Sequence, residues 1–200
     1  MKLRIRFTLL PGMMLLLAAC AQAAPLEPAP DSNRPSSAGG GEPREIDESK
    51  LVSDFDLIAY QGQAELGGDI VRFRDLLSQG KPVVLNFWAG LCPACVVEMK
   101  ELQITYEDYG DQIILVGLDV GPFVGLGSER DAKALLAELD ITYPAGTTTD
   151  SNVVRDYALL GMPTTYFISP EGELIDKWTG LLTRGKLAEL VDQLLEASAG

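Results

Sequence analysis

The chain has 200 residues, 46% of them hydrophobic, and a formal net charge of −13 at pH 7. This length allows one ordinary domain with extensions, and the apolar fraction is ample for a core. We do not expect so acidic a chain to bind nucleic acid, whose phosphates would repel it.

The N-terminus predicts export and a lipid anchor. Residues 1–19 combine three basic side chains, an apolar run over 7–19 and small residues at the end. This arrangement is typical of an export signal rather than a membrane span. Leu-Ala-Ala-Cys at 17–20 resembles the bacterial lipobox, which would make Cys20 the lipid-modified first residue of the mature protein. The alternative is an ordinary signal cleaved near residues 21–24, with an incidental cysteine.

Residues 20–50 are predicted to form a disordered tether. They are rich in proline, contain three consecutive glycines and carry almost no large apolar side chains. Such a segment cannot bury enough surface to offset the entropy lost on ordering. As a flexible coil, about 30 residues would span on the order of 30 Å, so the domain would work above a membrane surface.

The folded domain is predicted over residues 51–200. Residues 55–71 indicate an N-terminal β-hairpin, and residues 72–78 a brief helix or turn. The continuous apolar run Val83 to Trp88 is typical of a central strand covered on both faces.

A pair of cysteines follows that strand, where a predicted helix begins and runs to Tyr109. Cys92 is at the N-cap and Pro93 at the first helical position. Unpaired N–H groups of the first turn favour a thiolate there, by about 0.3–1 kcal/mol and up to roughly 2 kcal/mol when partly buried. This effect lowers the pKa of a thiol by about one unit. Cys92 is therefore the candidate attacking thiolate, and the more covered Cys95 the resolving thiol.

The helical spacing and the cysteine count support this assignment. Residues Cys95, Met99, Leu102, Tyr106 and Tyr109 repeat on one helix face, which we expect to be buried. The chain has three cysteines, so acylation of Cys20 leaves the local pair as the only thiols. No odd thiol would then be exposed in an oxidising compartment.

The second half of the chain alternates predicted strands and helices. Its segments are, in order, a strand over 112–120, a loop over 121–127, a helix from a Ser128 capping box to Leu139, a strand over 141–145, a short helix capped by Asp150, a hairpin of strands 164–168 and 173–178, and a terminal helix from Thr183. This order predicts an α/β fold, with a central mixed β-sheet flanked by helices on both faces.

Two motifs some 70 residues apart carry a family resemblance. They are Phe87-Trp88-x-x-x-Cys92-x-x-Cys95 and Gly161-Met162-Pro163-Thr164-Thr165. Together they resemble the thioredoxin fold, and in particular the membrane-tethered TlpA/ResA-like thiol–disulfide oxidoreductases, over about residues 51–197. The resemblance implies a protein-disulfide reductase that needs no cofactor or metal beyond the redox-active Cys92–Cys95 disulfide.

The resemblance also implies roles for residues outside the cysteine pair. Pro163 would be cis and pack against the disulfide, leaving the N–H and C=O of Met162 to bind an extended substrate segment. The alternative is a trans Pro163 that merely opens a strand. Trp88 lies near the active site, where it would contact substrate or be plain core.

Glu98 matches the position of an active-site glutamate in ResA-like proteins. A carboxylate near the buried thiol would move its proton, provided that burial raises the carboxyl pKa toward neutrality. The alternative is a solvated surface residue of the helix.

Two features depart from familiar members of the family. Leu91 precedes the first cysteine where relatives have a large ring, which leaves open the surface that the substrate meets. The Pro-Ala dipeptide between the cysteines lacks the histidine of the strong oxidant DsbA, which favours a reducing or intermediate potential.

The expected partners are exported proteins, apocytochrome c among them by analogy with ResA-like members, and a membrane electron donor. We expect a monomer held at the outer face of a membrane or in the periplasm by the lipid on Cys20. The alternatives are a disulfide-forming oxidant of the same fold, or a binding module with an inert disulfide. Metal handling is disfavoured because the chain has no histidine, and peroxidase chemistry because Ala89 replaces the expected threonine.

Overall fold

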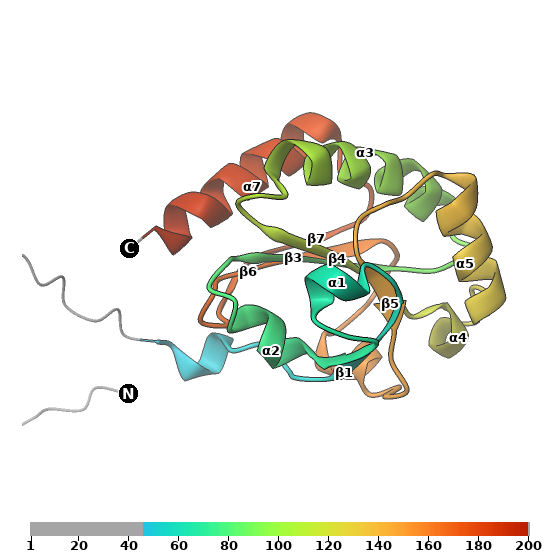
Figure 1. Cartoon of the computed structure of the whole chain (residues 1–200), viewed down its shortest axis with the longest axis horizontal. Coiled ribbons are helices and arrows are strands. Elements are labelled where there is room, and N and C mark those ends of the chain that lie inside the picture. The colour runs from blue at the N-terminus through green and yellow to red at the C-terminus, as the bar shows by residue number, and fades with distance from the viewer. Residues whose placement is uncertain (1–45, 200) are drawn as a thin grey trace, which may run out of the picture. The chain divides into compact units, whose positions relative to one another are not determined.

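A seven-stranded sheet runs through residues 46–199, the part of the chain that the computed structural model describes. The strands are β1 (Asp56–Gln61), β2 (Ile70–Arg72), β3 (Val83–Trp88), β4 (Ile114–Asp119), β5 (Ala145–Thr147), β6 (Thr164–Ile168) and β7 (Leu174–Thr179), in the spatial order β2-β1-β5-β4-β3-β6-β7 (Figure 1). The central strand β3 pairs parallel with β4 and antiparallel with β6. The predicted mixed sheet is therefore confirmed.

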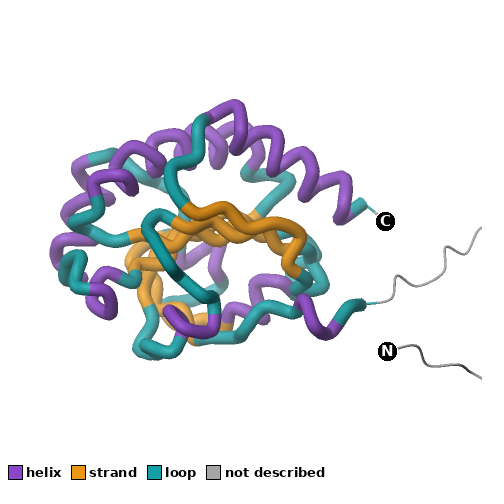
Figure 2. Tube along the Cα trace, turned by 180° about the vertical axis from the view of Figure 1, so that it is seen from behind, coloured by secondary structure: helices purple, strands orange, loops and turns teal. Residues whose placement is uncertain are grey.

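Helices cover both faces of this sheet. They are α1 (Gln63–Leu66), α2 (Phe73–Leu77), α3 (Pro93–Tyr109), α4 (Gly121–Val124), α5 (Glu129–Glu138), α6 (Val153–Asp156) and α7 (Arg184–Ser198). The long helices α3 and α7 lie side by side over one face, and α2 lies on the other (Figure 1). The same layering is visible from behind in Figure 2. Within residues 46–199, no helix has both the length and the apolarity to cross a bilayer.

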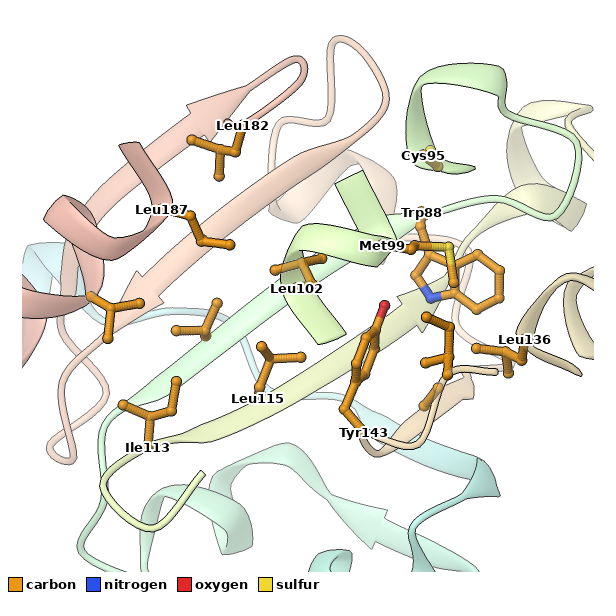
Figure 3. Packing of buried hydrophobic residues seen from close by; sticks show 14 of the residues in the cluster. Trp88, Cys95, Met99, Leu102, Ile113, Leu115, Leu136, Tyr143, Leu182 and Leu187 are labelled. Carbon is orange, nitrogen blue, oxygen red and sulfur yellow. The ribbon is translucent and has the colours of Figure 1, made fainter. Parts of the chain in front are cut away.

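The alternation of side chains along β3 divides the core into two layers. Val84 and Trp88 pack under α3 and α7, whereas Leu85 and Phe87 pack on the side of α2. Figure 3 shows the layer under α3, in which Met99 and Leu102 of the helix meet Trp88, Leu115 and Tyr143 from the sheet side. The same alternation directs Asn86, between Leu85 and Phe87, toward α3. The sheet therefore presents one polar side chain of β3 to the helix that carries the cysteines.

Most predicted elements are confirmed. The N-terminal hairpin is present, with β1 antiparallel to β2, and so is the hairpin of β6 and β7. Ser128 and Asp131 form the predicted capping box of α5, and Thr183 caps α7.

Three local predictions were wrong. The predicted loop over 121–127 contains the short helix α4. The predicted strand over 141–145 is displaced to Ala145–Thr147, because the carbonyls of Ile141 and Tyr143 accept hydrogen bonds from the Gln61 side chain instead of joining a ladder. The N-cap of α6 is Asn152, two residues after the predicted Asp150.

The folded region also extends slightly before the predicted start at Leu51. Residues Glu48–Lys50 form a 3-10 helix, and the N–H of Asp47 donates to Glu173 at 2.5 Å. The predicted signal peptide, Cys20 and the first part of the predicted tether lie outside the described residues.

Candidate active site

The two cysteines lie where β3 gives way to α3. Cys92 is the N-cap of α3 and Pro93 its first residue, as predicted, and the N–H of Cys95 donates to Cys92 Sγ at 3.2 Å. The cysteines form a disulfide with their Cα atoms 5.3 Å apart. Gly90 lets this loop approach α5, because a Cβ there would lie 2.5 Å from the main-chain nitrogen of Ala132. The helix terminus is thus positioned to stabilise a thiolate at Cys92.

The two sulfurs differ in access in the predicted sense. Cys92 is 4% exposed and borders a cleft of about 390 Å³, whereas Cys95 has no exposed surface. The cleft is also lined by Pro93, Ala94, Val124, Leu126 and residues 159–162. A larger cleft, of about 510 Å³ beside Tyr157 and Lys177, contains no cysteine. Only the cleft at Cys92 combines a hollow surface with the redox-active disulfide among the described residues.

The loop before β6 forms the opposite wall of this cleft. The Met162–Pro163 bond is cis, as the resemblance implies, so the interpretation of a trans proline is wrong. Met162 borders the cleft. Its main-chain N–H and C=O have no hydrogen-bond partner within residues 46–199. These groups are available to a polypeptide that enters the cleft.

Glu98 lies one turn after Cys95 on the buried face of α3. Its side chain has no exposed surface, so the interpretation of a solvated surface residue is wrong. Its Oε2 accepts from the N–H of Leu182 at 2.7 Å, and its Oε1 accepts from the Asn86 amide at 2.7 Å and from the Thr165 hydroxyl at 3.1 Å. The carboxyl group is therefore fixed between α3, the sheet and the loop that follows β7.

Burial dominates the ionisation of this group. Desolvation raises the pKa of Glu98 from 4.5 to about 7, and the hydrogen bonds from Leu182, Thr165 and Asn86 offset only part of that rise. A carboxyl group with a pKa near 7 exchanges its proton readily at neutral pH. Glu98 can thus take up or release a proton near neutral pH.

The hydrogen-bond donors to Glu98 were missed by the sequence analysis. Asn86 and Thr165 are register partners on β3 and β6, and the Asn86 amide also donates to the Thr165 hydroxyl at 2.9 Å. Asn86 is the one polar residue in the apolar run over 83–88, which was a usable signal. The Leu182 N–H left no signal, because main-chain donors in loops have no sequence signature.

Two residues of the active-site region fit the core better than a binding role. Trp88 is fully buried, so the predicted contact with substrate is wrong in this structure and its alternative interpretation as a core residue is the better one. On α3, Cys95, Met99 and Leu102 are buried as predicted, whereas Tyr106 and Tyr109 are half-buried. Thr105, rather than Tyr106, lies on the buried face.

A second buried carboxyl group was also missed. Asp119, at the end of β4 and opposite Trp88 in the ladder, accepts from the Tyr60 hydroxyl at 3.1 Å and from the N–H of Gly121 at 2.9 Å. Burial raises its pKa above the ordinary value. It does not line the cleft at Cys92, and we assign it a role in holding α4 to the sheet. Within residues 46–199, no cluster of three or more candidate metal-ligating side chains occurs.

Comparison with known proteins agrees with this geometry. The sequence profile of the AhpC/TSA family matches residues 50–177. The chain belongs to this family. Among curated proteins, it is 33% identical to the thiol-disulfide oxidoreductase ResA of Oceanobacillus iheyensis over 189 residues, which cover 93% of this chain and 88% of that protein. Together with the Cys92–Cys95 disulfide, whose Cys92 borders a cleft, this relationship identifies a thiol–disulfide oxidoreductase.

Solved structures show the same fold. StoA from Bacillus subtilis superposes with a TM-score of 0.57 at 18% identity, covering 71% of this chain and 98% of its own. The exposed lipoprotein thioredoxin Etrx1 of Streptococcus pneumoniae superposes with a TM-score of 0.57 at 25% identity, covering 70% and 99%. These neighbours place the chain in the thioredoxin fold, as the resemblance predicted.

Replacing Glu98 is expected to change how stability depends on pH. The pKa of Glu98 is higher in the folded protein, about 7, than its ordinary value of 4.5, so the folded state binds the proton more tightly. This contribution is fully present below the unfolded pKa and is lost as pH rises through the folded pKa. In urea unfolding of the oxidised protein, the free energy of unfolding of the wild type should therefore fall by up to about 3 kcal/mol relative to that of Glu98→Gln between roughly pH 4.5 and pH 8.

The matched control is Glu107→Gln, which alters an exposed carboxyl group on the same helix. Its stability should follow the wild-type pH profile. Parallel profiles for the wild type and Glu98→Gln would contradict the raised pKa.

Proposed function

We propose that this enzyme reduces disulfides of exported proteins, apocytochrome c among them, at the extracytoplasmic face of a membrane to which Cys20 tethers it. The observation that carries the proposal is the combination of a cleft-lining Cys92, a buried Cys95 and a buried carboxyl group one turn further on. This arrangement suits a dithiol that attacks with one sulfur and resolves with the other.

The reaction begins with the reduced enzyme. The Cys92 thiolate attacks one sulfur of the substrate disulfide, forming a mixed disulfide and releasing the other substrate sulfur as a thiolate. The Cys95 thiolate then attacks Cys92 Sγ, which frees the second substrate thiolate and leaves the Cys92–Cys95 disulfide. Two electrons pass from the enzyme to the substrate, and the substrate thiolates take up two protons from solvent or from neighbouring groups.

Glu98 acts in the second step of this sequence. Cys95 must lose its proton before it attacks, and it lies in an apolar environment that disfavours the thiolate. Glu98 shares the buried face of α3 with Cys95, and its pKa of about 7 allows it to accept that proton. Asn86 and Thr165 are positioning residues, because they hold the carboxyl group without contacting the cleft.

The surroundings of Cys92 favour reduction of substrates over their oxidation. The hydrogen bond to Cys92 Sγ comes from the main-chain N–H of Cys95, and the chain has no histidine to supply a cation between the cysteines. A Cys92 thiolate that is less stabilised than the one in DsbA makes the dithiol a better electron donor than that oxidant. Regeneration then requires a second dithiol, which we assign to a membrane protein that delivers electrons to the extracytoplasmic side.

Location is proposed from the N-terminus and from named relatives. The lipobox-like residues 17–20 supply the anchor, and Etrx1, a structural neighbour, is itself described as an exposed lipoprotein. ResA, to which the chain is related, supports the choice of a thiol–disulfide exchange partner. The choice of apocytochrome c as a substrate rests on the family resemblance alone.

Cysteine variants test the order of the two attacks. Cys95→Ser should trap a mixed disulfide between Cys92 and a substrate protein, because the resolving thiol is missing. Cys92→Ser should trap none and should lower turnover by at least about 100-fold. Non-reducing gel electrophoresis of the protein incubated with an oxidised substrate protein measures both outcomes. Trapping through Cys95 in the Cys92→Ser variant, at a rate equal to that through Cys92, would contradict the assignment.

Replacement of Cys20 tests the anchor. In a bacterial host that processes lipoproteins, the wild-type chain should sediment with membranes and incorporate labelled fatty acid. Cys20→Ala should lose both properties, since acylation needs the cysteine sulfur. The anchor is contradicted if the wild-type chain takes up no fatty acid, or if Cys20→Ala takes up as much.

A further inference from the structure

A solvent-exposed leucine stands beside the cleft that contains Cys92. Leu160 is 93% exposed and directly precedes Gly161 and Met162, which line that cleft. A single exposed leucine is ordinary on a protein surface. Leu91, next to Cys92, is also 60% exposed, and its N–H donates to the carbonyl of Leu126 in the cleft wall. The disulfide is therefore bordered by apolar side chains that a docking partner would cover.

The fold holds Leu160 in this exposed position. Ala158 has φ 43°, a left-handed conformation that is uncommon for a residue other than glycine. Its carbonyl accepts from Lys177 Nζ at 2.9 Å, and the neighbouring carbonyl of Tyr157 accepts from both Lys177 and the Tyr166 hydroxyl. Specific hydrogen bonds that maintain an unfavourable backbone conformation are common in functional segments. The turn that presents Leu160 is thus fixed by strands β6 and β7.

Leu160 and Leu159 separate two clefts. One is the cleft at Cys92, and the other has a volume of about 790 Å³. Phe123 of α4 and Val154 of α6 line this second cleft, together with Ser151, Asn152, Arg155 and Ala158. The charge of Arg155 is paired with Asp156, at 2.9 Å. A large apolar side chain can bind there without leaving an unpaired charge against it.

We propose that this second cleft is a specificity site, which binds a bulky apolar side chain that the substrate protein carries within about four residues of the cysteine that Cys92 attacks. The inference rests on the proposed function, because a disulfide must first dock at Cys92. The occupant follows from continuity with the catalytic cleft. Leu159 and Leu160 line both clefts, so a polypeptide that passes from Cys92 over Leu160 enters the second cleft next. An extended chain advances about 3.3 Å per residue, so this path spans only a few residues.

Peptides with an internal disulfide test the specificity site. A series carries leucine, phenylalanine or serine at each position from two to four residues away from either cysteine and is otherwise identical. The full chain with Cys20→Ser, reduced beforehand, should reduce the best leucine or phenylalanine peptide with a kcat/KM at least about tenfold above that of its serine counterpart. Leu160→Asp should abolish this preference.

Three controls make the result specific. Ile70→Asp alters an apolar side chain that is 67% exposed on the edge strand β2, away from both clefts, and should retain the preference. Phe123→Ala alters a side chain that lines the second cleft but not the cleft at Cys92, and it should lose the preference. Bis(2-hydroxyethyl) disulfide is too small to reach the second cleft from Cys92, so Ile70→Asp and Phe123→Ala, which alter no residue of the Cys92 cleft, should reduce it at the wild-type rate.

Each contrary outcome has a distinct meaning. Equal rates for all peptides in the wild type would overturn the specificity site while leaving the reductase intact. Retention of the preference in Phe123→Ala, with its loss in Leu160→Asp, would place the side chain in the Cys92 cleft and also overturn the inference. A dimer that Leu160→Asp dissociates in sedimentation would assign this surface to self-association instead. Failure of the wild type to reduce even the small disulfide would refute the proposed function.

Discussion

Three hydrogen bonds to the Glu98 carboxyl group join four segments at the active site. Glu98 belongs to α3, which carries both cysteines, and its partners come from β3, from β6 just after Pro163, and from the loop after β7. That loop is tied to the cis-proline segment as well, since the N–H of Gly180 donates to the carbonyl of Pro163 at 2.8 Å. One buried side chain therefore links the helix that carries the disulfide to the strand that follows the cis-proline segment.

The same burial gives Glu98 its chemistry. An exposed carboxyl group would be ionised well below neutral pH and would be a poor proton acceptor for a thiol. Burial in the apolar layer under α3 raises the pKa of Glu98 to about 7. Its hydrogen bonds partly offset this rise by stabilising the ionised carboxylate. The environment of Cys92 is the opposite one. Cys92 faces the cleft at a helix N-terminus, where the thiolate is favoured. The asymmetry between the two sulfurs thus follows from opposite environments three residues apart.

Much of the fold and the centre of the site could be predicted from local sequence signals. The Cys-Pro pair after a buried strand determines the N-cap, and Ser128 with Asp131 determines a helix start, because both depend on neighbouring residues alone. The strand predicted at 141–145 failed for a non-local reason, since Gln61, some 80 residues earlier, occupies the carbonyls that a ladder would use. Asn86 and Thr165 could not be linked to Glu98 before the pairing of β3 with β6 was known. The position of Leu159 and Leu160 between two clefts could not be predicted either, because it depends on how separate loops pack.

The equilibrium reduction potential of the Cys92–Cys95 pair tests the central claim most directly. It is measured by titrating the protein carrying Cys20→Ser, whose only thiols are this pair, against dithiothreitol at pH 7. We expect a value near that of thioredoxin, about −270 mV, because the dithiol is proposed to donate electrons to exported proteins. A value near that of DsbA, about −120 mV, would make the protein an oxidant and contradict the proposed direction of electron flow.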